Sequence, residues 1–216
     1  NDFMGPTLWP ADMAIYAAVN QRPDGDLGGS HLDMLHQSPL CMGIEHATAN
    51  QYYVFDGLNG NIVHYDFRMD HGPGYDDHSD GVVRRFMETE VRRLANVPSH
   101  LALDHDSGWL YVADTGNSRV IRLDTRSGDE TGNLRPFGEP LAGYFAVTGA
   151  TIELVTDTDL TAPSGIALHD GKLFVSDHAT GEIVAFDLEG AELGRIDTGP
   201  AGIMGLEFGR DGKLYF

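Results

Sequence analysis

The sequence predicts an all-β fold, a β-propeller built from four-stranded blades. A recurring module predicts it: each copy opens at a proline, forms a short apolar strand, turns into a strand ending in aspartate, and closes with an alternating third strand. The 27 glycines and 10 prolines indicate many tight turns, and 41% hydrophobic residues are enough for a packed core. One module cannot bury both of its faces alone, so we expect modules stacked around a common axis.

The two clearest copies of the module match nearly position by position. The first begins at Pro98 and reads PSHLALDHDSGWLYVADTGNSRVIRLD, and the second begins at Pro163 and reads PSGIALHDGKLFVSDHATGEIVAFD. A third, from Pro39, reads PLCMGIEHATANQYYVFDGLNGNIVHYD, and a last, from Pro200, reads PAGIMGLEFGRDGKLYF. A fainter copy opens at Pro6. We therefore expect blades to begin near residues 6, 39, 98, 163 and 200, within one propeller domain spanning residues 1–216.

Tight turns join the strands within each module. The sequences LNG at 58–60, TGN at 115–117 and ATG at 179–181 supply residues that tolerate positive φ, as hairpins require. The third strands, around 120–123 and 183–186, alternate with β-branched and aromatic residues. This pattern favours a pleated sheet over a helix.

Longer segments between the modules are expected to carry the fourth, outer strands. Val82–Phe86 and Thr151–Val155 have the required apolar, β-branched composition. Met87–Val97 is interpreted as strand or loop, with a short helix as the alternative because Glu88 and Arg92 stand four residues apart.

The last module stops within its second strand, at Phe216. A propeller ring closes by pairing strands from its first and last blades. Since the modules amount to about four or five blades, we expect a longer native polypeptide with about six.

The charge balance limits the possible partners. With 33 acidic against 14 basic residues, the formal net charge is −19, which repels polyanions and excludes nucleic acid as an expected partner. A metal cation or a cationic ligand is favoured, and the alternative is a solubilising surface suited to a salty exterior. Four arginines form the one basic cluster in the sequence, interpreted as counter-charge for acidic neighbours rather than a binding patch: Arg84, Arg85, Arg92 and Arg93.

Cysteine usage and hydropathy exclude two further classes. Cys41 is the single cysteine, so the chain forms no internal disulfide and has no CxxC motif. No apolar run approaches the ~20 residues that span a bilayer, so no membrane span is expected.

One rim of the propeller is expected to collect polar side chains. The first and second strands of a module run antiparallel, so the start of the first lies beside the end of the second. Ligands usually bind at such a mouth. The predicted ligand-binding set is Cys41, Asp56, Ser99, His100, Asp114, Ser164, Asp177 and His178. The alternative for the aspartates is capping of their own loops, and for the histidines a hydrogen-bonded role without a ligand.

The most unusual local composition is DHGPGYDDHSDG, at residues 70–81. Oxygen-rich loops with glycine bends bind calcium, whereas histidines with carboxylates favour zinc or another transition metal. The predicted metal ligands are His71, Asp76, Asp77, His78 and Asp80, with His100 and His178 from the rim, and the expected ion is Ca or Zn. The alternative is a solvated acidic loop, or one paired with nearby arginines.

The strings WLYVADTGNSRVIRLD, LFVSDHATGEIVAFD and YYVFDGLNGNIVHYD resemble the NHL repeat of six-bladed propellers, from Pro39 onward. Within that superfamily the chain looks like the propeller of the peptidylglycine amidating lyase and, more loosely, the gluconolactonase and paraoxonase group. In the amidating lyase group, histidines after the opening prolines hold an axial zinc ion. The corresponding residues here are Leu40, Ser99, Ser164 and Ala201, with His100 one position beyond. In the lactonase group a PNG asparagine helps to hold calcium, and this chain has PSG at 163–165.

Two functions of different classes are expected. The leading hypothesis is a secreted or periplasmic propeller whose central mouth binds a small-molecule or peptide ligand, with or without a cation. The alternative is a metal-dependent lyase or hydrolase resembling the amidating lyase, with His100 and His178 as metal ligands or base and Asp114 and Asp177 as supporting carboxylates. The GxSxG, HExxH, P-loop and GxGxxG motifs are absent, so the common hydrolase, zincin and nucleotide-binding classes have no support.

Overall fold

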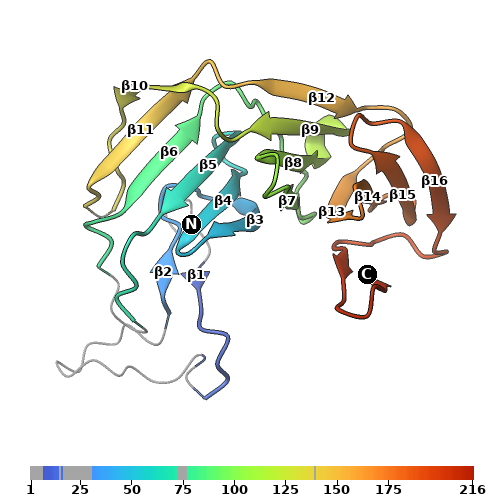
Figure 1. Ribbon diagram of the computed structural model, residues 1–216, viewed down its shortest axis with the longest axis horizontal. Coiled ribbons are helices and arrows are strands. Elements are labelled where there is room, and N and C mark those ends of the chain that lie inside the picture. The colour runs from blue at the N-terminus through green and yellow to red at the C-terminus, as the bar shows by residue number, and fades with distance from the viewer. Residues whose placement is uncertain (1–6, 15, 17–30, 73–76, 139) are drawn as a thin grey trace.

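The computed structural model describes residues 7–14, 16, 31–72, 77–138 and 140–216. The described residues form three large sheets and two two-stranded ones. The three large sheets are arranged in an arc, each with its first strand on the concave side (Figure 1). The first strands of successive sheets contact one another, as blades do around a propeller axis.

The first sheet contains β3 (Cys41–Thr48), β4 (Gln51–Asp56), β5 (Asn61–Asp66) and β6 (Val82–Phe86), each antiparallel to its neighbour. The predicted outer strand Val82–Phe86 is confirmed with the same bounds. This blade is therefore a four-stranded meander that begins two residues after Pro39.

The second sheet contains β7 (Leu101–Leu103), β8 (Trp109–Asp114), β9 (Arg119–Asp124) and β12 (Ile152–Thr156), with the short 3-10 helix η1 (Thr115–Asn117) at its turn. Its outer strand is shifted by one residue toward the C-terminus from the predicted range Thr151–Val155. The segment leading into β7 contains turns and an isolated bridge between Leu94 and Val97, so the preference for strand or loop over helix is confirmed.

The third sheet contains β13 (Pro163–His169), β14 (Lys172–Asp177), β15 (Glu182–Asp187) and β16 (Glu192–Asp197). A small hairpin follows it, made by β17 (Glu207–Phe208) and β18 (Leu214–Tyr215). β17 contacts β13, so this hairpin occupies the place of a further blade's first two strands.

At the other end of the chain, β1 (Thr7–Leu8) pairs with β2 (Asp33–Met34). The module expected from Pro6 is represented in the described residues by this strand pair.

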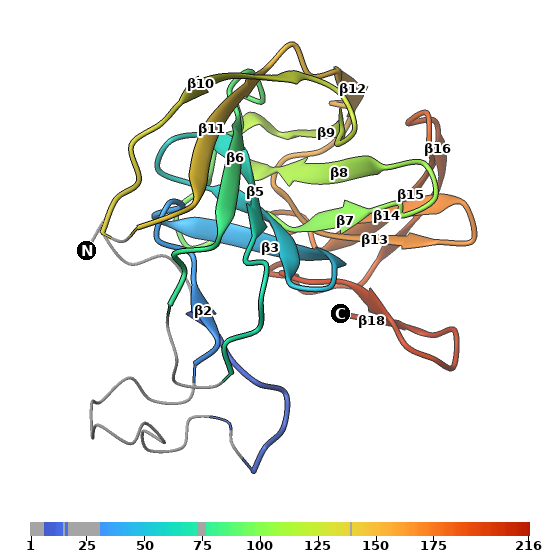
Figure 2. The same cartoon turned by 60° about the vertical axis from the view of Figure 1, so that its left-hand side comes forward.

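An outer hairpin is inserted between β9 and β12 of the second sheet, but it pairs with the first sheet. It is formed by β10 (Asp129–Asn133) and β11 (Gly143–Thr148). β11 pairs in parallel with β6, so the first sheet gains two strands from the second module and becomes six-stranded. Figure 2 shows β11 beside β6 on the outside of the arc. The two strands of this inserted hairpin, β10 and β11, were not predicted from the sequence.

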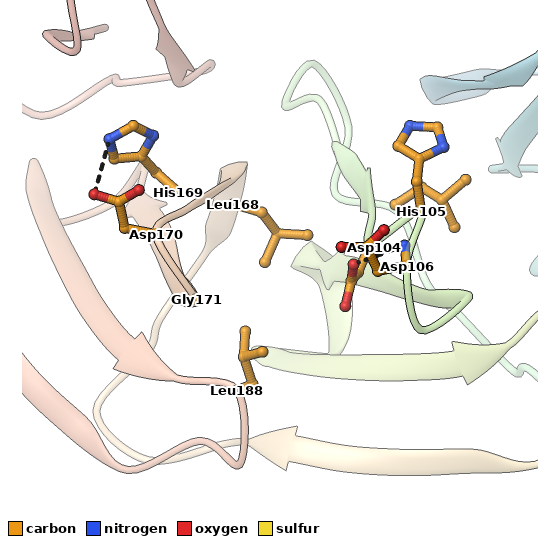
Figure 3. A pocket seen from close by; sticks show the side chains of 9 residues that line it. Asp104, His105, Asp106, Leu168, His169, Asp170, Gly171 and Leu188 are labelled. Atoms are coloured by element: carbon orange, nitrogen blue, oxygen red, sulfur yellow. Dashed lines mark hydrogen bonds and ion pairs between the residues drawn. The ribbon is translucent and has the colours of Figure 1, made fainter.

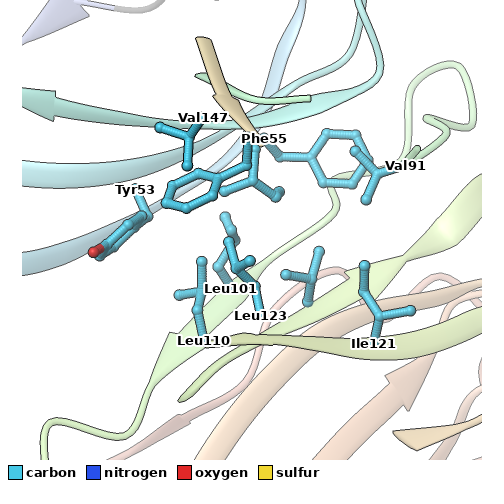
Figure 4. Close-up of a cluster of buried hydrophobic side chains, with 11 residues drawn as sticks. Tyr53, Phe55, Val91, Leu101, Leu110, Ile121, Leu123 and Val147 are labelled. Atoms are coloured by element: carbon cyan, nitrogen blue, oxygen red, sulfur yellow. The ribbon is translucent and has the colours of Figure 1, made fainter. Parts of the chain in front are cut away.

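Apolar side chains between neighbouring sheets form the core. Between the first and second sheets, Phe55 packs with Leu110 and Leu123 (Figure 4). Ile62 belongs to the same cluster, and all four side chains are fully buried. Burial of each such side chain stabilises the fold by about 1.5–3 kcal/mol. A second cluster joins the second and third sheets, where Tyr111 packs among branched aliphatic residues. No helix long and apolar enough to span a membrane occurs in the described part of the chain.

Candidate functional site

The strand register brings together the strand starts and ends that the sequence assigned to one rim. Cys41 faces Asp56 across β3 and β4, and Pro163 faces Asp177 across β13 and β14. This neighbourhood follows from the antiparallel meander, and a ligand-binding role for these residues stays a prediction.

The carboxylates at this rim accept hydrogen bonds from their own loops. Asp177 is 1% exposed and accepts hydrogen bonds from the backbone amides of Thr161, Ala162 (3.2 Å) and Ala179 (2.9 Å). Asp56 is fully buried and accepts from the amides of Leu58 and Asn59, both at 3.0 Å. The contacts with Leu58, Asn59 and Ala179 are those that the loop-capping alternative predicts, whereas Thr161 and Ala162 belong to the segment before β13.

Two of these aspartates also pair with arginine. Arg85 Nη1 lies 2.8 Å from Asp56 Oδ2, and Arg119 Nε lies 2.7 Å from Asp114 Oδ2. Arg85 is buried as well, and its Nε donates to the Tyr144 hydroxyl at 2.8 Å. The Asp56 carboxylate is therefore compensated within the protein.

Hydroxyl groups at the strand starts connect the second and third sheets. The Ser99 and Thr115 hydroxyl oxygens lie 2.7 Å apart, and Thr115 Oγ1 donates to the Pro163 carbonyl at 2.6 Å. Ser164 Oγ donates to the Pro98 carbonyl at 2.9 Å. Ser99 and Ser164 are both fully buried. Their observed contacts are with the protein itself.

The Cys41 thiol is neutral at physiological pH. Burial raises its pKa to about 12, and its Sγ donates to the Gly43 carbonyl at 3.3 Å. A thiol in this state is a poor nucleophile and a poor metal ligand.

His100 lies on the concave side of the arc and lines an inner groove of about 280 Å³. The groove is lined by the first strands β3, β7 and β13 together with β17, and Figure 2 shows the first three side by side. Its polar side chains are Glu45, His100 and Glu207, among aliphatic neighbours from each strand. The side chains of Ser99 and His100, which precede β7, lie in different surroundings: Ser99 is buried beside the Thr115 hydroxyl, and His100 lines the groove.

Burial shifts two pKa values in the inner groove in opposite directions. It lowers the pKa of His100, so this imidazole is neutral at pH 7. Burial also raises the pKa of the Glu45 carboxyl, partly offset by the Leu103 amide, which donates to Oε1 at 3.1 Å, and Glu207 adds a smaller upward contribution. A neutral imidazole and a partly desolvated carboxyl group therefore share one cavity.

The sequence analysis missed Glu45 and Glu207. The sequence prediction used the residues next to the opening prolines, whereas Glu45 lies in the middle of β3 and Glu207 lies seven residues after Pro200. The residue after the apolar run of the first strand is Glu45, Asp104 or His169 in the three clear modules. A polar residue that recurs at this position of each module was the signal from which Glu45 could have been identified.

The predicted metal ligands lie in separate contacts. His71 Nε2 is 3.1 Å from Asp80 Oδ1, and Asp77 Oδ1 accepts the Ser79 amide at 2.9 Å. His78 is buried, with Nδ1 3.1 Å from Asp33 Oδ1. Of the two rim histidines, His100 lines the inner groove and His178 does not. Asp76 lies outside the described residues. Within the described ranges, no three His, Cys, Asp or Glu side chains are grouped so that they could hold a metal ion.

A second groove, of about 450 Å³, lies between the β7–β8 turn and the β13–β14 turn. Figure 3 shows Asp104, His105 and Asp106 on one side, and His169 and Asp170 on the other, with Leu168 and Leu188 between them. The His169 ring stacks on Phe208 with centroids 4.1 Å apart.

No protein-family model and no curated protein matches the chain. Among solved structures, it is similar to the nidogen/laminin complex, with 15% identity over 81% of this chain and 54% of that chain and a TM-score of 0.54. It is also similar to a streptogramin B lyase, with 13% identity over 81% of this chain and 46% of that chain and a TM-score of 0.51. A catalytically inactive virginiamycin B lyase from Staphylococcus aureus, solved with quinupristin, matches with 13% identity over 85% of this chain and 50% of that chain, at a TM-score of 0.51.

The chain spans about half the length of these solved structures. At such identities the likeness concerns the fold, and it agrees with the sheets described above. The β-propeller predicted from the sequence is confirmed. The narrower resemblance to the NHL repeat stays a prediction.

Proposed function

We propose that the protein is a ligand-binding propeller that takes a small polar molecule in its inner groove. The observation that carries the proposal is that His100 and Glu45, whose pKa values burial shifts, line one cavity where the first strands of successive sheets meet. Cavities that combine concave shape, apolar walls and perturbed titratable groups are the usual locations of ligand sites.

The ligand is expected to present hydrogen-bond donors or a positive charge. Glu45 and Glu207 offer carboxylate oxygens, and the neutral His100 offers one donor and one acceptor nitrogen. The net charge of −19 attracts cations to the molecule and repels anionic ligands from it. A cavity of about 280 Å³ suits a small molecule or a single side chain of a peptide.

The described residues do not fit a resident calcium or zinc ion, because no three ligating side chains converge among them. We derive no chemistry from such an ion. Calcium and zinc nevertheless belong among the probes, because the composition of residues 70–81 suggested them. A secreted or periplasmic location is likewise part of the proposal, supported by the acidic composition.

A second candidate function, a lyase or hydrolase, is favoured by one observation. The neutral His100 could accept a proton, and the Glu45 carboxyl, with its raised pKa, could hold one, in the same cavity. This alternative assigns no role to His178, which lies outside the groove.

The test is a thermal-unfolding screen of the purified protein against spermidine, a neutral sugar, calcium and zinc. A ligand at about 100 times its Kd stabilises the fold by about 2.7 kcal/mol, which raises Tm by about 5–10 °C in a chain of this size. Glu45→Gln and His100→Gln should remove the increase for a ligand of the inner groove.

Glu189→Gln, on an exposed turn of the third sheet, is the matched control and should keep it. A ligand whose effect is the same in wild type, Glu45→Gln and His100→Gln would contradict the assignment of the groove. Turnover of a bound ligand that disappears in His100→Gln, while binding persists, would favour the enzyme.

A further inference from the structure

A third cavity, the rim groove, lies at the loop end of the first and second sheets. It has a volume of about 500 Å³ and separates the β4–β5 turn, Gly57–Gly60, from the segment Val91–Ala95 that leads into β7. None of its residues lines the inner groove. It is therefore a separate candidate site.

Both walls of the rim groove are fixed by the repeated aspartates. Asp56 holds the turn through the amides of Leu58 and Asn59. Asp114 Oδ1 accepts the Arg92 amide at 2.7 Å, which holds the opposite wall. The Val91 amide donates to the Gly60 carbonyl at 3.0 Å and joins the two walls at their base. The groove is thus preformed rather than assembled by a ligand.

Two arginine side chains line the groove without a carboxylate partner. Among the described residues, neither Arg92 nor Arg93 forms an ion pair, whereas Arg84, Arg85 and Arg119 pair with Glu130, Asp56 and Asp114. The interpretation of the sequence cluster as counter-charge is confirmed for Arg84 and Arg85, and for Arg92 and Arg93 it stays a prediction. The stem of Arg93 lies against the Gly57 backbone, since a Cβ on Gly57 would be 2.8 Å from Arg93 Cδ.

Apolar side chains are exposed in the same groove. Leu58 is 48% exposed on one wall, and Leu94 is 42% exposed on the other. An exposed aliphatic pair beside two uncompensated cations resembles the composition of a binding surface more than that of an ordinary solvated rim.

The repeat itself shows that the fold does not require these arginines. In the next module, Thr161 donates its amide to Asp177, as Arg92 does to Asp114 in its own module. Both contacts are made by the backbone amide, and Thr161 is neutral. This contact between the loop and the repeated aspartate therefore forms without a positive charge on the donating residue.

We propose that the rim groove binds an acidic peptide segment of a partner protein, with carboxylates on Arg92 and Arg93 and an apolar side chain between Leu58 and Leu94. The planar guanidinium group pairs with carboxylates through two parallel hydrogen bonds, which gives orientation as well as attraction. The rest of a molecule of net charge −19 repels such a peptide, so its binding is confined to this groove. This partner is distinct from the ligand of the inner groove.

The experiment uses fluorescence polarisation with a labelled peptide of about ten residues that combines glutamates with spaced leucines. The test variant is Arg92→Thr with Arg93→Ala, which removes both charges and keeps the backbone amide that residue 92 donates to Asp114. The control variant is Lys172→Ala with Arg210→Ala, which removes the same charge from two exposed residues that also have no ion pair among the described side chains. Circular dichroism checks that both variants are folded.

We expect the test variant to bind the peptide about tenfold more weakly than wild type, and the control variant to bind within about twofold. Raising the salt from about 20 mM to about 500 mM should weaken binding to wild type more than to the test variant. The proposal is overturned if wild type gives no saturable binding up to about 1 mM peptide, or if both variants lose affinity equally. Stronger binding of an oligothymidine of similar length would assign the groove to nucleic acid and would also overturn it.

Discussion

Replacement of the three repeated aspartates by asparagine separates two contributions to stability. Asp56, Asp114 and Asp177 occupy the same position in their modules and all accept backbone amides of loops. They differ in their cationic partner: Asp56 pairs with a buried arginine, Asp114 with a partly exposed one, and Asp177 with none that the described residues provide. The series therefore compares a buried ion pair with loop capping alone.

We expect Asp56→Asn to lower the free energy of unfolding by about 3–5 kcal/mol, because it leaves the buried Arg85 guanidinium without its compensating charge. Asp177→Asn keeps one acceptor oxygen and should cost about 1–3 kcal/mol. Asp114→Asn should be closer to Asp177→Asn, since the Arg119 side chain is 31% exposed and can be solvated when its partner is lost.

The assay is urea denaturation at pH 7, followed by circular dichroism and by tryptophan fluorescence, with the midpoints compared at unchanged slope. Arg85→Met in the Asp56→Asn background should recover part of the loss, because it removes the uncompensated charge. An Asp56→Asn variant no less stable than Asp177→Asn would refute the reasoning, and so would a double variant less stable than Asp56→Asn.

Three further predictions follow from buried groups and close contacts. Burial lowers the pKa of His64 to about 4, so the unfolded chain takes up a proton first as the pH falls below about 6.5; stability should fall by roughly 3 kcal/mol between pH 6.5 and 4, and His64→Gln should flatten this part of a urea-midpoint profile. Gly190→Ala should lower Tm by several degrees, because Gly190 has a φ of +92° and a Cβ there would collide with the Val155 carbonyl; Gly194→Ala, with open space at its Cβ, is the control. Tyr144→Phe removes the hydroxyl that accepts from Arg85 and should cost about 1–3 kcal/mol in the same denaturation assay, whereas no change would show that water replaces it.

The blade structure could be predicted from the sequence because each module is local. The strand that ends in Asp114 and the turn that follows it are specified by neighbouring residues, and the copy ending in Asp177 repeats them. The outer strand Val82–Phe86 was identifiable from its composition alone. Alternation and turn chemistry act within a few residues, so one sequence is enough to detect them.

The site could be predicted only in part, because it depends on where distant side chains point. The rim aspartates were expected near the mouth, yet their carboxylates accept the amides of their own loops. Glu45 and Glu207 share a groove although they lie far apart in the sequence, and no periodicity records that contact. The ion pair between Arg85 and Asp56 could not be predicted for the same reason, because the two side chains come from different strands, β6 and β4.

The parallel pairing of β11 with β6 has a consequence for how the molecule opens. The insertion that carries β11 starts and ends in the second blade, so the outer strand β6 of the first blade is covered by a hairpin that the second blade anchors. Backbone amides of β6, which would fray readily at a free edge, are then expected to exchange with solvent as slowly as those of the central strands. The two blades are coupled into a single cooperative unit, whereas the third blade, with its fully exposed outer strand β16, can fluctuate by itself.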